Sequence, residues 1–188
     1  MSGGNMPQDS RFLNPGDWAV GGAGDVFGTL LGSCVALVLW HPAMRIGALC
    51  HYVLPRREGG ATGPGCDGRY GNEAFDLMVD ALADRFIPLA QCTAKLFGGA
   101  QVYDAPPGIQ IDIGARNIAC ARDWVADAGL ALAAEHVGGR GWRRLCFDVA
   151  SGQVWVRFNT LENGAAAAGG AAGGMIHAQA FNSSEVAR

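Results

Sequence analysis

The feature that most constrains the fold is a tight turn that opens directly into a short apolar run, over residues 32–40. The run is rich in Val and Leu and extends only six residues beyond Cys34. This length and composition are typical of a buried strand rather than a helix. Gly32 allows the backbone to pass close to a neighbour or to take a positive φ angle, so the turn presents Cys34 at the mouth of the strand.

A second apolar run follows at residues 46–55, after a turn at His41 and Pro42. Adjacent antiparallel strands would place Cys34, at the start of one, opposite His51, near the end of the other. An imidazole beside a thiol is the arrangement that deprotonates a cysteine nucleophile. The pair therefore predicts that Cys34 ionises, and is alkylated, more readily than an ordinary cysteine.

Apolar residues at helical spacing predict two helices, over residues 72–86 and 117–128. Asn72 is the expected N-terminal cap of the first helix, whose apolar face extends to Phe86, and Gly129 is expected to end the second. Further strands are predicted at residues 18–20, 93–97, 130–137, 144–149 and 153–158. Residues 56–71 have no periodic pattern and are predicted to form a long loop, which in a compact domain is more often functional than not.

The length of 188 residues suits one domain with a sizeable core. Residues 1–15 are predicted to be a flexible N-terminus, and residues 16–161 to form the folded domain. From residue 162 to residue 188 the chain is dominated by Ala and Gly, which bury little apolar surface, so this segment is predicted to be a disordered tail.

The charge balance and the cysteine pattern exclude several classes of function. A net charge of −3 gives no basic surface for nucleic acid, and no apolar run is long enough to span a bilayer. The N-terminus lacks the basic start and apolar core of a signal peptide, so we expect a soluble, cytoplasmic protein without direct membrane insertion. The six cysteines form no Cys-x-x-Cys pair and no His lies near two of them, so neither a metal site nor a cofactor is expected.

The Cys34 and His51 segments, together with five later blocks in the same order, carry a resemblance to a known family. The blocks are residues 29–36, 51–55, 69–71, 95–100, 113–117, 134–139 and 151–156. They are similar to the signature of the CheD family, the chemoreceptor glutamine deamidases, over about residues 15–160. The blocks around residues 98–99 and 116–117 fit the family without a chemical step assigned to them, and turn glycines and a helix start explain them equally well.

The resemblance implies an α/β fold: a single-domain layered α/β sandwich with a mainly antiparallel or mixed sheet and two main helices. It implies hydrolysis of glutamine side-chain amides on the cytoplasmic helices of methyl-accepting chemotaxis receptors, with a chemotaxis phosphatase as a further partner. The nucleophile maps onto Cys34 and the base onto His51. A threonine completes the family's triad, and here it is Thr29, although some members place this hydroxyl one residue earlier, where this chain has Gly28.

Two other functions remain open at the level of sequence. A non-catalytic chemotaxis adaptor that binds receptors or a phosphatase would keep the fold but would not need both Cys34 and His51. A redox-sensing thiol protein would need a resolving cysteine, and none lies near Cys34 in the sequence. The presence of both reactive side chains favours the enzyme.

Overall fold

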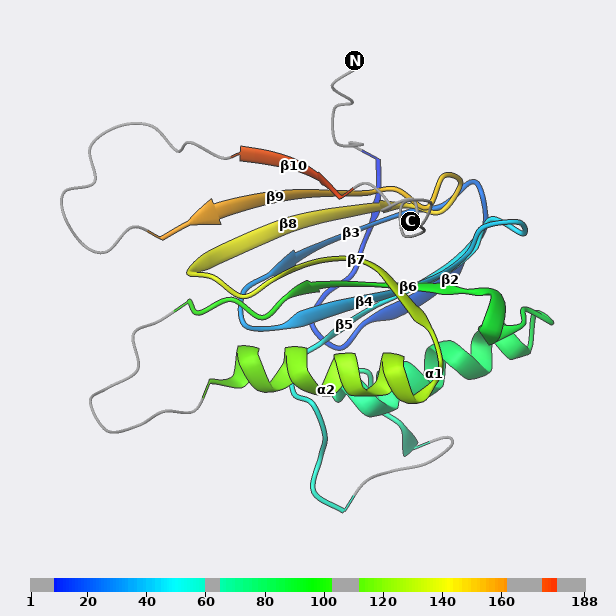
Figure 1. Cartoon of the computed structure of the whole chain (residues 1–188), viewed down its shortest axis with the longest axis horizontal. Helices are drawn as coiled ribbons and strands as arrows, with labels where there is room; N and C mark the ends of the chain where they lie inside the picture. Colours follow the sequence, from blue (N-terminus) through cyan, green and yellow to red (C-terminus); the bar gives the residue numbers. More distant parts are fainter. Residues whose placement is uncertain (1–8, 60–64, 103–111, 162–173, 179–188) are drawn as a thin grey trace, which may run out of the picture.

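The computed structural model describes residues 9–59, 65–102, 112–161 and 174–178. Two five-stranded β-sheets stack face to face, and two helices cover the outer face of one sheet (Figure 1). The sheet next to the helices is termed the central sheet and the other the outer sheet. The predicted α/β sandwich with two main helices is confirmed, and its strands form two mixed sheets.

The central sheet consists of β2 (Trp18–Gly21), β4 (Val35–His41), β5 (Ile46–Tyr52), β6 (Thr93–Gly98) and β7 (Ala131–Val137), in the order β2-β5-β4-β6-β7. The outer sheet consists of β1 (Arg11–Phe12), β3 (Val26–Leu31), β8 (Gly141–Asp148), β9 (Val154–Thr160) and β10 (Gly174–Ala178), in the order β1-β3-β8-β9-β10. The helices are α1 (Gly71–Ala83) and α2 (Ile113–Asp127), and a short 3-10 helix, η2 (Leu89–Gln91), precedes β6.

Strand β4 lies at the centre of the molecule and is buried on both faces. Val35, Leu37 and Leu39 pack against the cluster under the helices. Ala36 and Val38 pack against the cluster between the two sheets. A strand covered on both sides shows no polar alternation, which explains why the sequence of β4 is a continuous apolar run.

Helix α1 differs from the prediction at both ends. It begins at Gly71, with Tyr70 as the residue before it and no side-chain cap, so the assignment of Asn72 as the cap is wrong. Residue 71 is glycine because a Cβ there would lie only 2.6 Å from the Trp124 ring. The helix ends before Phe86, which is 93% exposed with φ at +57° and does not belong to the apolar face.

Helix α2 begins at Ile113, four residues before the predicted start. The side chain of Asp112 caps it by accepting a hydrogen bond from the N–H of Ala115 at 2.8 Å. The predicted end is confirmed, because Gly129 follows the helix with φ at +67°.

The predicted strands in the central and outer sheets are confirmed, but three strands were not predicted. Strand β3 is one, and β1 and β10 fall in segments predicted to be flexible or disordered. Within residues 1–15, β1 pairs in parallel with β3, and Leu13 is buried and donates its N–H to the carbonyl of Gly28 at 2.8 Å. Within residues 162–188, β10 pairs antiparallel with β9.

Main-chain hydrogen bonds to an existing sheet edge form both β1 and β10, and composition does not predict such bonds. Residues 1–8, 162–173 and 179–188, on which the remainder of those two predictions falls, lie outside the described residues.

Candidate active site

The two predicted reactive side chains lie between the sheets, where β4 begins. Cys34 immediately precedes β4 and packs against the cluster between the sheets. In the antiparallel pair of β4 and β5, His51 lies opposite Ala36, which faces the same cluster. His51 is therefore diagonal to Cys34, two positions along the strand, rather than directly opposite as the sequence predicted. Diagonal neighbours on one face of a sheet remain within reach of longer side chains.

Thr29 approaches His51 from the other sheet. It lies on β3, is fully buried, and its Oγ1 is 2.8 Å from Nδ1 of His51. Gly28 lies on the opposite face of β3, because a Cβ there would meet the side chain of Ser10. Of the two positions considered for the third residue, the structure brings Thr29 to the imidazole.

The hydrogen bonds of Thr29 determine which nitrogen of His51 carries the proton. Its hydroxyl has one proton, which it donates to the main-chain carbonyl of Leu13 at 2.8 Å. The hydroxyl oxygen must then accept the second bond, so Nδ1 of His51 is the donor. In the neutral ring Nε2 is then unprotonated and carries the accepting lone pair. Nε2 is buried and has no hydrogen-bond partner.

The surroundings of His51 favour its neutral form. Burial lowers the pKa of His51, and the carbonyl of Leu13 and the negative charge of Asp17 oppose that shift only in part. A neutral imidazole with a free Nε2 is the form that accepts a proton. The ring is thus a base at pH values where an ordinary histidine is already partly protonated.

Cys34 is also favoured in its neutral form. Burial raises the pKa of the Cys34 thiol, and its own main-chain N–H lowers it by a smaller amount. This direction is opposite to the one expected from the sequence. Both pKa shifts disfavour the charged form, so they favour a neutral thiol and a neutral imidazole over a thiolate and an imidazolium.

The turn before β4 is fixed by main-chain contacts with the end of β6. The carbonyls of Gly32 and Cys34 accept hydrogen bonds of 2.8 Å from the N–H groups of Ala100 and Gly99. Gly32 serves close approach, because a Cβ there would lie 2.7 Å from Cγ2 of Val102. The turn can approach this closely only without a side chain at residue 32.

The segment that follows β5 is anchored to α1 by an ion pair whose carboxylate is buried and whose guanidinium is partly exposed. Arg57 donates to Glu73, with 2.7 Å between Nε and Oε1, and the N–H of Asp67 donates to the same carboxylate at 2.7 Å. Burial alone would raise the pKa of Glu73, but these hydrogen bonds outweigh it and the pKa is lowered. Two residues of the predicted loop at residues 56–71 are therefore bonded to α1, and residues 60–64 within that loop lie outside the described residues.

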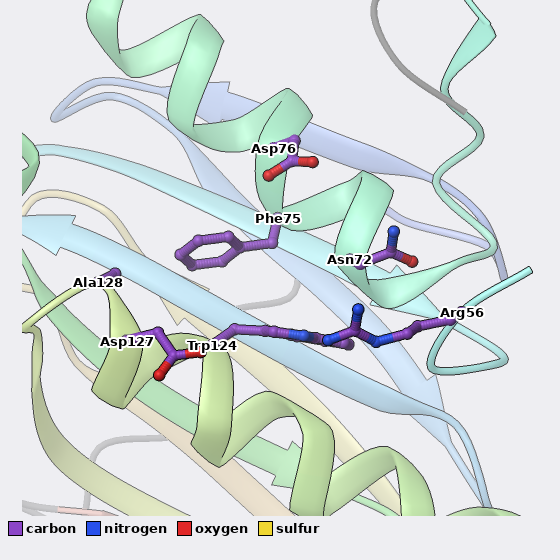
Figure 2. Close-up of a pocket in the computed structure, with 7 residues that line it drawn as sticks. All are labelled: Arg56, Asn72, Phe75, Asp76, Trp124, Asp127 and Ala128. Carbon is purple, nitrogen blue, oxygen red and sulfur yellow. The ribbon is translucent and has the colours of Figure 1, made fainter. Parts of the chain in front are cut away.

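A separate pocket of about 400 Å³ lies between α1 and α2, and Figure 2 shows its lining. Arg56 reaches over the ring of Trp124 at 5.9 Å, and Asp76 and Asp127 lie at the sides. Its lining includes neither cysteine nor histidine, so it supplies no nucleophile or base of the predicted kind. Trp124, at its floor, makes an edge contact with Tyr52, the neighbour of His51.

Two further properties concern the described residues as a whole. No three His, Cys, Asp or Glu side chains converge there in a way that could hold a metal ion. None of the helices in that part of the chain is long and apolar enough to cross a membrane.

The structure adds two contributors that the sequence did not predict. The carbonyl of Leu13 directs the proton of Thr29, and a main-chain group has no side-chain signal by which to find it. Asn117 donates its side-chain amide to the carbonyls of Ser33 and Val53. Its signal was the block at residues 113–117, to which the sequence assigned no role.

Comparison of the chain with known proteins points to one family. A sequence profile described as "CheD chemotactic sensory transduction" matches residues 53–158, a range that begins just after His51. A protein of Dechloromonas aromatica named "Probable chemoreceptor glutamine deamidase CheD 3" is 48% identical over 147 residues, covering 78% of this chain and 86% of that protein. Similarly named proteins of Chromobacterium violaceum and Natronomonas pharaonis are 43% identical over 150 residues and 38% identical over 138 residues. These alignments cover 79% of this chain and 77% of the former protein, and 73% of this chain and 81% of the latter.

Proposed function

The chain belongs to the CheD family, and on that premise we propose that it is a chemoreceptor glutamine deamidase with Cys34 as nucleophile, His51 as general base and Thr29 as the residue that orients His51. It hydrolyses glutamine side-chain amides on the cytoplasmic helices of chemoreceptors to glutamate and ammonia. It acts in the cytoplasm, uses no cofactor, and a chemotaxis phosphatase is a further candidate partner.

One observation carries the assignment of roles. The hydroxyl of Thr29 accepts from Nδ1 of His51 at 2.8 Å while donating to the carbonyl of Leu13, so the lone pair of the imidazole is on Nε2. That nitrogen is buried, unpartnered and on the same side of the central sheet as Cys34. A base oriented by a third group, on the same face as a thiol, is the arrangement that activates a cysteine nucleophile.

Because the thiol and the imidazole are neutral at rest, proton transfer accompanies attack. Nε2 of His51 takes the proton of Cys34 as the sulfur adds to Cδ of the glutamine. The electron pair of the amide carbonyl moves to its oxygen, beside the main-chain N–H groups of the turn. The tetrahedral intermediate then collapses, and His51 returns the proton to the departing ammonia.

The second half of the reaction releases the enzyme. Water, deprotonated by His51, adds to the γ-glutamyl thioester, and the sulfur leaves with the proton that His51 returns to it. The product is a glutamate carboxylate where a neutral amide stood. Each event therefore adds one negative charge to the receptor.

The test is the intact mass of a receptor cytoplasmic fragment before and after incubation with the protein. Conversion of an amide to an acid adds about one dalton per glutamine, and this gain should disappear with Cys34→Ala. The adaptor alternative predicts binding of the fragment without any mass change. A mass gain that persists with Cys34→Ala would assign the nucleophile to a different residue.

A further inference from the structure

A third contact on the nucleophile turn comes from the side chain of Asn117. This residue is fully buried in α2, and its Nδ2 lies 3.2 Å from the carbonyl oxygen of Ser33 and 2.9 Å from that of Val53. One amide group therefore connects the residue before the nucleophile to the segment that leaves β5 after His51. No other side chain among the described residues bonds to both segments in this way.

The orientation of this amide is fixed by its partners. If the group were rotated by half a turn, Oδ1 would face the oxygens of Ser33 and Val53, and none of the three could donate. The main chain of Asn117 is held as well, because Tyr52 donates its hydroxyl to the Asn117 carbonyl at 2.7 Å. Oδ1 is buried and has no hydrogen-bond partner. Burying Oδ1 without a partner costs free energy, and an apolar side chain of similar size would fill the same space without this desolvation penalty.

The carbonyl that Asn117 holds belongs to the peptide unit that carries the N–H of Cys34. A peptide unit is planar and trans, so its C=O and N–H point in opposite directions, and fixing one fixes the other. The carbonyl of Gly32, held by the N–H of Ala100, directs the N–H of Ser33 in the same way. Neither the N–H of Ser33 nor that of Cys34 donates to another residue within the described ranges.

We propose that Asn117 is a positioning residue for the oxyanion hole: through the carbonyl of Ser33 it aims the N–H of Cys34 at the oxygen that becomes charged during attack. The proposal rests on the proposed function only in taking Cys34 as the nucleophile. Asn117 itself touches neither substrate nor sulfur. Its effect is confined to reactions of Cys34 that pass through a tetrahedral oxyanion.

Two electrophiles separate this role from a general effect on the thiol. With p-nitrophenyl acetate, the sulfur of Cys34 adds to the carbonyl carbon, an oxyanion forms, and p-nitrophenolate leaves. With iodoacetamide, the sulfur displaces iodide from a saturated carbon and no oxyanion forms. Both rates are measured at Cys34 by peptide mapping at one fixed pH, with Cys34→Ala as the blank.

Replacing Asn117 by leucine removes both donors at similar volume. Loss of one oxyanion-hole donor typically costs 10²–10³ in rate, and a misdirected donor should cost less, so we expect the ratio of acylation to alkylation to fall by about ten- to a hundred-fold. The alkylation rate should change much less than the acylation rate, since burial has the larger effect on the pKa of the Cys34 thiol and the main-chain N–H of Cys34 has the smaller one. If Asn117→Leu does not fold, Asn117→Ala is measured in its place.

Val125→Ala is the matched control, because Val125 is buried in the same helix two turns further on. It should lower the melting temperature and leave the ratio at the wild-type value. An unchanged ratio in the Asn117 variant, an equal fall in the control, or no acylation of wild-type Cys34 would overturn the proposal. Absence of deamidation in wild type with the expected fall in the ratio would instead count against the proposed function alone.

Discussion

A buried histidine lies near each end of β4, His41 on β4 itself and His51 on the neighbouring strand β5, and the two differ in their hydrogen bonds. His41, at the far end, is 4% exposed, and His51, beside the start of the strand, is 2% exposed. Nδ1 of His41 accepts from the N–H of Met44 at 3.2 Å, and its Nε2 is 3.0 Å from Oε1 of Gln91. Both ring nitrogens of His41 are thus satisfied, whereas His51 bonds through Nδ1 and leaves Nε2 unpartnered.

Burial therefore does not distinguish the two histidines, whereas the number of ring nitrogens that have a hydrogen-bond partner does. Buried polar groups in proteins are nearly always paired, and the unpaired Nε2 of His51 is consistent with the role of base that we propose for it. At His41 the two bonds join β4 to the turn after it and to η2. At His51 the single bond to Thr29 fixes the ring and leaves Nε2 unpaired on the face of the central sheet that also carries Cys34.

The largest expected effect separates the two histidines directly. His51→Ala should lower kcat for deamidation by about 10²–10⁴-fold, the usual contribution of a general base. His41→Ala should change kcat by less than about threefold but lower the free energy of unfolding by about 1–3 kcal/mol, because it leaves the partners of both ring nitrogens unpaired. Steady-state ammonia release and urea unfolding measure the two quantities. Equal losses of kcat in both variants would contradict the distinction.

A smaller effect is expected from the group that orients His51. Thr29→Val keeps the shape of the side chain and removes the hydroxyl, so the imidazole loses its fixed tautomer and kcat should fall by about ten- to a hundred-fold. Thr29→Ser, which retains the hydroxyl, should recover most of this loss. Gln91→Met, the corresponding change at His41, should leave kcat unchanged. A Thr29→Ser variant as slow as Thr29→Val would show that packing matters here rather than the hydrogen bond.

The same contrast explains which parts of the fold could be predicted from the sequence. Strands β4 and β5 were predicted because burial on both faces produces unbroken apolar runs. Strand β3 was missed because its inward-facing Thr29 is polar, and it is buried there only through its bonds to Leu13 and His51. A polar residue of the candidate site thus interrupts the apolar pattern from which β3 would be predicted.

The starts of the helices were missed for a related reason. Both α1 and α2 have glycine in the first turn, which in a sequence resembles a loop. Gly71 is required by the rings of Trp124 and Tyr52, and a Cβ at Gly114 would lie 2.5 Å from the carbonyl oxygen of Gly99. Tertiary contacts of this kind have no local signal. The pair of Cys34 and His51 was predicted from the two adjacent strands, and the resemblance implied their roles, while the contacts of Asn117 could only come from the structure.

The pH dependence of catalysis gives a more modest test of the His51 environment. Protonated His51 cannot accept the thiol proton, so kcat/KM should fall with decreasing pH as His51 titrates. Because burial lowers the pKa of His51, the midpoint should lie below the ordinary value of about 6.5. His41→Ala should not move this midpoint.

The ionisation of Cys34 is tested separately by alkylation. Since burial raises the pKa of Cys34, the rate of iodoacetamide labelling of the resting enzyme should still be rising with pH above about pH 8.5. A labelling rate that is already at its plateau at neutral pH would indicate a resting ion pair instead.

The smallest effect is expected at Lys95, which pairs with Val38 in the middle of β4 and is buried beside Trp40. Its Nζ donates to the carbonyl of Gly152 and lies 5.8 Å from the ring of Trp40, and no salt bridge to it is formed among the described residues. Burial lowers the pKa of Lys95, so the unfolded chain binds the proton more tightly than the folded one. The charge therefore opposes folding at neutral pH, and this penalty decreases as pH rises towards the unfolded pKa of about 10.4.

Lys95→Met replaces the buried ammonium with an apolar side chain of similar length. The variant loses one hydrogen bond to Gly152 and also loses the cost of burying a charge, so the free energy of unfolding at pH 7 should change by less than about 1 kcal/mol. Its stability should also lose the rise between neutral pH and about pH 10 that Lys95 gives the wild type. Deamidation should be unaffected, because Lys95 pairs with Val38 on β4, well beyond Cys34. Urea unfolding of both proteins at several pH values measures these terms. A loss of more than about 2 kcal/mol at pH 7 would show that the bond to Gly152 stabilises the fold by more than burial of the charge costs.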